Sequence, residues 1–136
     1  MTPIDRPRTW RFASHLRDTD LSLTHHIALL RDCYRATATE GPLTTRAMVV
    51  LPQSIHAVWQ LPATVEPLPR WQRFTKTLMR HLPQPVALHP AWVAPVMSED
   101  IPRTVADIHA QPVAWRLVEQ AEDWPFSSVH RLGVAA

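Results

Sequence analysis

Three stretches of the chain carry the side-chain pattern of β-strands. Residues 9–16 alternate apolar and polar side chains, which predicts a strand. Residues 43–51, which are apolar and rich in β-branched side chains, and the alternating residues 54–61 are separated by a two-residue turn, which predicts a β-hairpin. Because successive side chains of a strand point to opposite faces, Ser54 and His56 are expected on one face of the second hairpin strand.

A longer period, with apolar side chains three and four residues apart, indicates helices elsewhere. Residues 23–38 and 70–82 both show it, and the proline-rich stretch 62–69 between the hairpin and the second helix predicts a loop. We expect the first helix to end at Gly41, because glycine tolerates the left-handed conformation that often caps a helix.

The last third of the chain adds one strand and two helices. Residues 91–97 predict a short strand, which Pro95 restricts to a sheet edge or a bulge. Helices are expected over residues 101–110 and 112–121. The order β, α, β, β, α, β followed by helices predicts an α+β fold, namely a ferredoxin-like (split βαβ) antiparallel sheet with helices packed on one face. The length predicts a single domain over residues 1–136, with a core at about residues 9–132.

Composition excludes several classes of protein. No run approaches the roughly 20 apolar residues of a membrane span, and the N-terminal residues lack the apolar core of a secretion signal, so a cytoplasmic protein is expected. The single cysteine, Cys33, excludes an internal disulfide and a cysteine-based zinc cluster, and we expect it to pack as an apolar residue. With only two glycines and no glycine-rich motif, a nucleotide-binding loop is not expected.

Charge is balanced over the whole chain but locally positive. The formal net charge is +2, whereas residues 67–98 contain no acidic residue. The second predicted helix carries basic side chains three and four residues apart along one flank: Arg70, Arg73, Lys76 and Arg80. Such a flank is either a solvated helix face or a surface that contacts the phosphates of a nucleic acid. Arg6, Arg8 and Arg11 form a second, smaller basic group, and Trp71 is either a core residue or a platform for a base.

Several motifs in a fixed order resemble one family. They are RAMVVLPQSIHAVW (46–59), RWQRFTK (70–76), DIHAQPV (107–113) with Leu117-Val118, and EDWPFSSVHR (122–131). Together they resemble the REP-associated tyrosine transposases, relatives of the insertion sequence 200-like transposases within the HUH single-strand endonucleases. The resemblance covers about residues 10–132 and implies an HUH transposase-like fold and a DNA partner.

The chain departs from this family at the two positions that carry its chemistry. The resemblance implies a His-hydrophobic-His motif that binds a divalent metal ion, and a tyrosine that attacks DNA to form a phosphotyrosine link. In this chain Ser54 replaces the first histidine and leaves only His56, while Asp107 replaces the tyrosine. The only tyrosine, Tyr34, lies on the apolar face of the first predicted helix, where we expect it in the core. A phosphotyrosine mechanism is therefore not expected at this place.

A weak metal site is one interpretation of what remains. His56, Asp107, His109 and Gln111 lie near the family's site if the resemblance holds, and Gln111 shares a helix face with Asp107 four residues earlier. Imidazole, carboxylate and amide groups can hold Mg²⁺ or Mn²⁺ weakly. The alternative is a hydrogen-bonded histidine and carboxylate without an ion, so binding of the metal is expected to be weak or absent.

Three hypotheses for function follow. The first is a protein of the transposase family that binds single-stranded or hairpin repeat DNA without cutting it; its DNA-binding residues would be Arg70, Arg73, Lys76, Arg80 and Arg131. The second is an active metal-dependent DNA nickase or transposase with an altered site. The third is a protein–protein interaction module that retains the fold. No membrane partner is expected, and a monomer and a homodimer are both compatible with the sequence.

Overall fold

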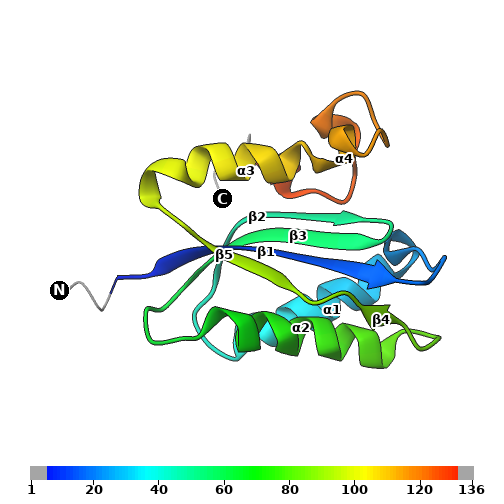
Figure 1. The fold of residues 1–136 in the computed structure, drawn as a ribbon, viewed down its shortest axis with the longest axis horizontal. Coiled ribbons are helices and arrows are strands. Elements are labelled where there is room, and N and C mark those ends of the chain that lie inside the picture. The colour runs from blue at the N-terminus through cyan, green and yellow to red at the C-terminus, as the bar shows by residue number, and fades with distance from the viewer. Residues whose placement is uncertain (1–5, 132–136) are drawn as a thin grey trace.

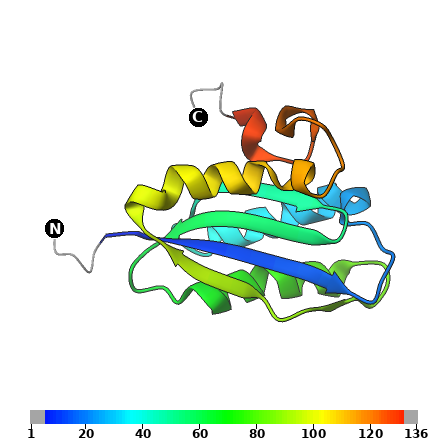
Figure 2. The same ribbon diagram turned by 45° about the horizontal axis from the view of Figure 1, so that its top comes forward.

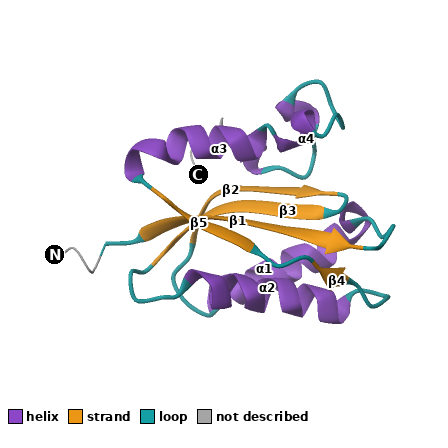
Figure 3. Ribbon diagram, in the orientation of Figure 1, coloured by secondary structure: helices purple, strands orange, loops and turns teal. Residues whose placement is uncertain are grey.

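The computed structural model, which describes residues 6–131, is built around an antiparallel sheet (Figures 1 and 3). Strands β2, β3 and β1 lie side by side in that order, and β4 and β5 both pair with the other edge of β1. The predicted hairpin is confirmed, and β5 is an edge strand as Pro95 indicated. The short strand β4 was not predicted. The bounds are β1 (Arg8–Arg17), β2 (Thr44–Leu51), β3 (Ser54–Leu61), β4 (Ala87–Leu88) and β5 (Trp92–Val96).

Helices cover both faces of the sheet. A 3₁₀ turn, Leu23–His26, leads into α1 (Ile27–Thr39), which packs with α2 (Pro67–His81) on one face. The helix α3 (Ile101–His109) lies on the opposite face, next to the short α4 (Gln111–Ala114) (Figures 1 and 2). The expected antiparallel α+β architecture is confirmed, but the expected single layer of helices is corrected to two layers.

Two layers form because the hairpin is apolar on both of its faces. Trp59 and Ile55 point toward α1 and α2, whereas Val49 and Val58 pack against Ile108 of α3. The sequence pattern of the hairpin showed which side chains alternate. It did not show that the side chains on both faces of the hairpin are buried beneath helices.

Aromatic rings form the centre of the larger core, beneath β1 and β3. Phe12 stacks on Trp71 with ring centroids 4.8 Å apart, and Trp59 packs against both rings. The indole N–H of Trp71 donates a hydrogen bond of 2.8 Å to the Ser14 hydroxyl. Trp71 is fully buried and is therefore a core residue and not a platform for a base. Cys33 is buried in the same cluster, as expected.

Two helix boundaries differ from the prediction. α2 begins at Pro67 and not at residue 70, because the first turn of a helix tolerates proline, whose missing N–H has no partner there. The helix expected over residues 112–121 is replaced by the four-residue α4. Its end is a Schellman motif, in which the backbone N–H of Leu117 donates to the Pro112 carbonyl and that of Arg116 donates to the Val113 carbonyl, both at 2.9 Å.

The residues that end these helices were hard to recognise from sequence. Arg116 adopts the left-handed conformation, with φ 58°, that glycine usually provides at this position. Conversely, Gly41 lacks the left-handed conformation expected of it after α1. Its role is close approach, since a Cβ atom at this position would lie 3.2 Å from Nη1 of Arg70.

The C-terminal segment covers the outer edge of β2. The backbone N–H of Val50 donates to the Phe126 carbonyl at 3.0 Å, and the Trp124 indole N–H donates to the Val50 carbonyl at 2.9 Å. Ser127 forms an isolated bridge with Val49. Covering an edge strand in this way protects it from pairing with another chain. Within residues 6–131, no helix has the length and apolar character needed to cross a membrane.

Candidate functional site

Strands β1 and β3 bring polar side chains together on the face of the sheet that carries α3. Ser54 and His56 share this face of β3, as the alternation predicted. The register of the sheet pairs Ser54 with His15 and His56 with Ala13 of β1. Arg11, two residues before Ala13 on β1, faces the same side. The site therefore contains a second histidine from a neighbouring strand.

His56 is buried and uncharged at neutral pH. Its side chain is 5% exposed, and its Nε2 atom lies 3.0 Å from the hydroxyl oxygen of Ser54. Burial, and then the nearby charges of His15 and Arg11, lower the pKa of His56 from 6.5 to about 4. The His15 ring approaches edge-on, with ring centroids 5.4 Å apart. Because Ser54 is also buried, little of this hydrogen-bonded pair is exposed to solvent.

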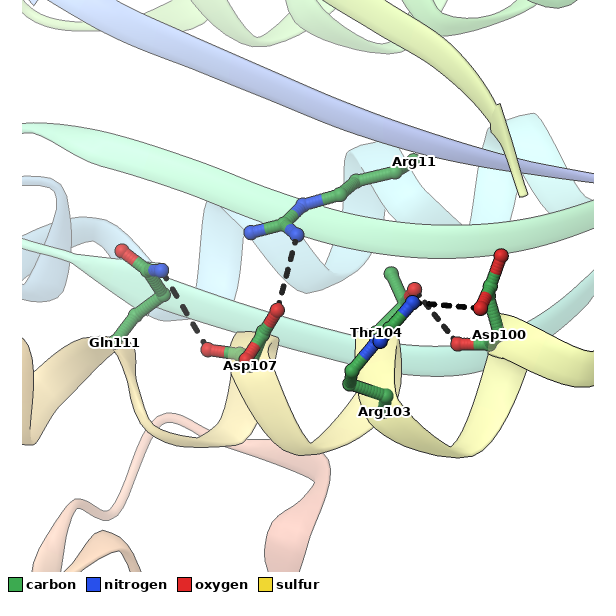
Figure 4. Close-up of polar contacts among 6 residues, drawn as sticks. All are labelled: Arg11, Asp100, Arg103, Thr104, Asp107 and Gln111. Atoms are coloured by element: carbon green, nitrogen blue, oxygen red, sulfur yellow. Dashed lines mark hydrogen bonds and ion pairs between the residues drawn. The ribbon is translucent and has the colours of Figure 1, made fainter. Parts of the chain in front are cut away.

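Asp107 lies on α3 at the rim of the same region. Its carboxylate is 59% exposed and forms an ion pair with the Arg11 guanidinium, with 3.6 Å between Oδ2 and Nη1 (Figure 4). The pair connects α3 to β1 across the sheet face. In an exposed position it stabilises the fold by less than about 1 kcal/mol. Its main effect is to place a negative charge next to Arg11.

Gln111 is turned toward a tryptophan that the sequence analysis did not single out. The Gln111 Oε1 atom accepts a hydrogen bond of 3.2 Å from the Trp115 indole N–H. Its Nε2 atom makes a long contact of 3.5 Å with the backbone carbonyl of Asp107 (Figure 4). Gln111 thus orients the indole ring with the oxygen that would otherwise ligate an ion.

The residues present do not fit the two-histidine ion site of the family. Only His56 remains of the motif, and its Nε2 atom is bonded to Ser54. Asp107 is paired with a cation, and Gln111 is bonded to Trp115. Within the described residues 6–131, no group of three histidine, cysteine or acidic side chains is arranged to hold a metal ion.

Tyr34, the only tyrosine of the chain, lies on the opposite side of the sheet. It belongs to α1 and packs edge-on against Trp59 and Phe74, with ring centroids 6.3 Å and 6.5 Å away. Its hydroxyl is hydrogen-bonded to the Thr45 hydroxyl. As expected, the phenol packs against core residues, and the sheet separates it from Asp107.

The predicted basic flank of α2 separates into two parts. Arg70 is 7% exposed, and its guanidinium donates to the backbone carbonyls of Thr37 at 2.8 Å and Gly41 at 2.9 Å. It joins α1 to α2 and cannot contact a phosphate without breaking these bonds. Arg73 is exposed and pairs with Glu40 at 3.0 Å. Lys76 and Arg80 are also exposed on the same helix.

The flank and Asp107, which the resemblance aligns with the family's tyrosine, lie on opposite faces of the sheet. α2 packs on the face of Trp59, whereas Asp107 lies on the face of His56. Arg11, from the second predicted basic group, belongs to the Asp107 side. Arg131 ends the 3₁₀ segment Ser128–Arg131, and its side chain lies outside the described part of the structure.

The tail motif is held by hydrogen bonds to the sheet and to α3. The Ser128 hydroxyl accepts the backbone N–H of Met48 at 2.8 Å and lies 2.9 Å from Nε2 of His109. Burial lowers the pKa of His109, so the imidazole is neutral at pH 7. The Nε2 atom of His130 lies 2.6 Å from the carbonyl oxygen of Trp124, a hydrogen bond between two residues of the tail. His109 therefore anchors the tail and does not face Asp107 as a ligand.

Two residues of the site, His15 and Trp115, were not found by sequence reasoning. His15 lies directly opposite Ser54, but this becomes visible only when the register of β1 and β3 is known. Trp115 was placed inside a helix that does not form. The sequence contained a usable signal only for His15, because it is a polar residue on a strand whose side chains alternate.

Comparisons with known proteins confirm the family resemblance of the sequence. The REP-associated tyrosine transposase of Escherichia coli strain K12 is 30% identical over 131 residues, with 90% of this chain and 77% of that protein covered. A Haemophilus influenzae protein that carries the same family name is 27% identical over 126 residues, covering 80% of this chain and 72% of that protein. No family model matches the chain.

A solved structure extends the agreement to three dimensions. A REP-associated tyrosine transposase bound to a REP hairpin superposes with a TM-score of 0.86 at 29% identity. The match covers 94% of this chain and 80% of that one. The overall fold of the chain is therefore shared with that structure.

Proposed function

The chain belongs to the REP-associated tyrosine transposase family, and from this membership we propose that it binds single-stranded or hairpin repeat DNA without cutting it. The similar protein of known structure is bound to a REP hairpin. This chain retains the fold and an exposed basic helix, while the residues at the family's catalytic positions have changed. The proposed role is recognition of DNA.

The replacement at residue 107 carries the proposal. The family's nucleophile is a tyrosine, and this chain has Asp107 there, in an ion pair with Arg11. A phosphotyrosine intermediate needs a phenol in line with the leaving oxygen. Tyr34 is on the other side of the sheet, with its hydroxyl bonded to Thr45. Asp107 cannot form that intermediate, and Tyr34 cannot reach the position.

Positive charge on α2 supports binding to DNA. Arg73, Lys76 and Arg80 are exposed on one helix, in a part of the chain without acidic residues. Each phosphate that such a side chain neutralises releases condensed counterions, which favours binding at low salt. Arg73 can exchange its single surface partner, Glu40, for a phosphate at small cost.

The test of binding is a titration of a fluorescent DNA hairpin with unpaired flanks, followed by anisotropy at several salt concentrations. We expect affinity to fall steeply with salt, and the combined Arg73→Ala and Lys76→Ala variant to bind more weakly with a salt slope lower by about one to two. Arg35→Ala is the matched control, because Arg35 is also exposed and paired with one carboxylate, that of Asp32.

The outcomes separate the parts of the proposal. Equally small effects of the double variant and of Arg35→Ala would show that α2 is not the DNA surface. A folded protein that binds no hairpin even at low salt would refute DNA recognition altogether. A shortened strand or a covalent adduct on a denaturing gel would refute the absence of cleavage.

A further inference from the structure

A hollow of about 580 Å³ opens beside the site at the end of β1. It lies between the end of β1, the β2–β3 turn and the loop that follows α4. Aromatic and apolar side chains, among them His15, Trp115 and Leu117, form much of its wall. Ser54 also lines it, so the hollow adjoins the buried His56 pair.

Trp115 is the unusual feature of this hollow. Its side chain is 57% exposed, although tryptophan buries more apolar surface than most other side chains when it packs. The exposed ring is nevertheless held in place. Its N–H is bonded to Gln111, and the Schellman turn at Arg116 fixes the backbone on its C-terminal side. The His15 ring lies nearby, with ring centroids 6.5 Å apart.

The polar groups of the wall suit an aromatic ligand with polar edges. Arg11 lies on the same face of β1 as His15, four residues earlier, and its charge acts on His56, which is hydrogen-bonded to Ser54 of the wall. Burial, and then the charge of His89, which also lines the hollow, lower the pKa of His15, so its imidazole is neutral and can exchange hydrogen bonds with a ligand. Asp20 adds an acceptor to the wall. A ring with polar edges, such as a nucleic-acid base, matches this set of groups.

We propose that the hollow receives one unpaired base of the bound DNA, stacked on the indole of Trp115 beside His15. This inference rests on the proposed function, because it names where on the molecule the unpaired part of the DNA lies. It places that part on the α3 side of the sheet, opposite the basic flank of α2. Stacking on an exposed aromatic ring is a common way to bind an unpaired base, and it tolerates different bases.

The experiment combines a protein variant with an altered DNA. Each unpaired nucleotide flanking a fluorescent hairpin is replaced in turn by an abasic site, and affinity is measured by anisotropy. For the wild-type protein we expect one position at which the abasic site weakens binding about tenfold. For Trp115→Ala we expect weaker binding of the intact DNA and no further loss from the same abasic site. Trp115→Phe is expected to retain most of the effect.

Trp92 provides the matched control. It is also an exposed tryptophan, at 52%, but it lies on β5 under the guanidinium of Arg11. In Trp92→Ala the abasic effect is expected to persist. Urea midpoints verify that all variants fold, and because both side chains are largely exposed, we expect little change in them.

Each outcome decides the inference. If the abasic effect survives in Trp115→Ala, or if no position shows one, the hollow does not hold a base, while hairpin binding stands. If Trp92→Ala abolishes the effect equally, stacking is not specific to the hollow. If the folded wild-type protein binds no hairpin, the proposed function fails and the inference fails with it.

Discussion

Arg70 and Arg73 are three residues apart on the same helix, and we predict that they act on different properties of the protein. Replacing Arg70 by alanine is expected to weaken the fold and leave DNA binding by the folded protein unchanged. Replacing Arg73 is expected to do the reverse. The difference follows from burial: the Arg70 guanidinium is enclosed between α1 and α2, while that of Arg73 is mostly in solvent.

The size of the Arg70 effect follows from its hydrogen bonds. The guanidinium donates to the Thr37 carbonyl in the last turn of α1 and to the Gly41 carbonyl just after it. These groups lie at the negative end of the helix, where a cation is favourable. A hydrogen bond from a charged donor contributes about 1.5–3 kcal/mol. The buried Nε atom has no partner and subtracts from the total. We therefore expect Arg70→Ala to lower the free energy of unfolding by about 3 kcal/mol.

Urea denaturation and hairpin anisotropy, measured on the same samples, test this separation. Arg73→Ala should change the free energy of unfolding by less than about 1 kcal/mol, because its ion pair with Glu40 is exposed. Arg70→Lys is informative as well, since lysine keeps the charge but cannot donate in the same fork. If Arg70→Ala is as stable as the wild type but binds DNA more weakly, the structural role assigned to Arg70 is wrong.

Three further predictions concern other parts of the molecule. Arg116→Gly should raise the free energy of unfolding by about 1 kcal/mol, seen as a higher melting temperature, because the left-handed position favours glycine; an unchanged or lower temperature contradicts this. The pKa of His56 in the folded protein, about 4, lies below the ordinary value of 6.5. Between these pH values the unfolded chain binds more protons than the folded one. The free energy of unfolding should therefore fall by up to about 3 kcal/mol as pH drops from 6.5 to 4. Urea midpoints across this range check the fall, and His56→Gln should reduce it. Asp107→Asn should raise hairpin affinity roughly twofold, because it removes a negative charge beside Arg11; weaker binding would assign Asp107 a direct role.

The fold was largely predictable because its pattern is local. The β2–β3 hairpin follows from side-chain alternation around a two-residue turn, and α1 and α2 follow from apolar spacing. The helix expected over residues 112–121 failed for a physical reason. The chain leaves α4 through a left-handed residue that is arginine and not glycine, so no sequence signal marks the turn.

The site was predictable only where one element contains it. Ser54 and His56 lie two residues apart on one strand, so their shared face could be derived. His15 joins them through strand register, and Trp115 through a turn that the sequence did not indicate. Arg70 showed the opposite limit. Helical spacing placed Arg70 on the same flank as Arg73. The spacing could not show that α1 would bury Arg70 and leave Arg73 exposed.

The central claim is that this member of the family binds hairpin DNA and leaves it intact. The most direct measurement incubates the protein with an end-labelled hairpin with unpaired flanks, with and without Mn²⁺, and runs native and denaturing gels in parallel. The account predicts a shifted band on the native gel and a full-length strand, free of attached protein, on the denaturing gel. A cleaved strand or a protein–DNA adduct that survives denaturation, in either condition, would contradict it.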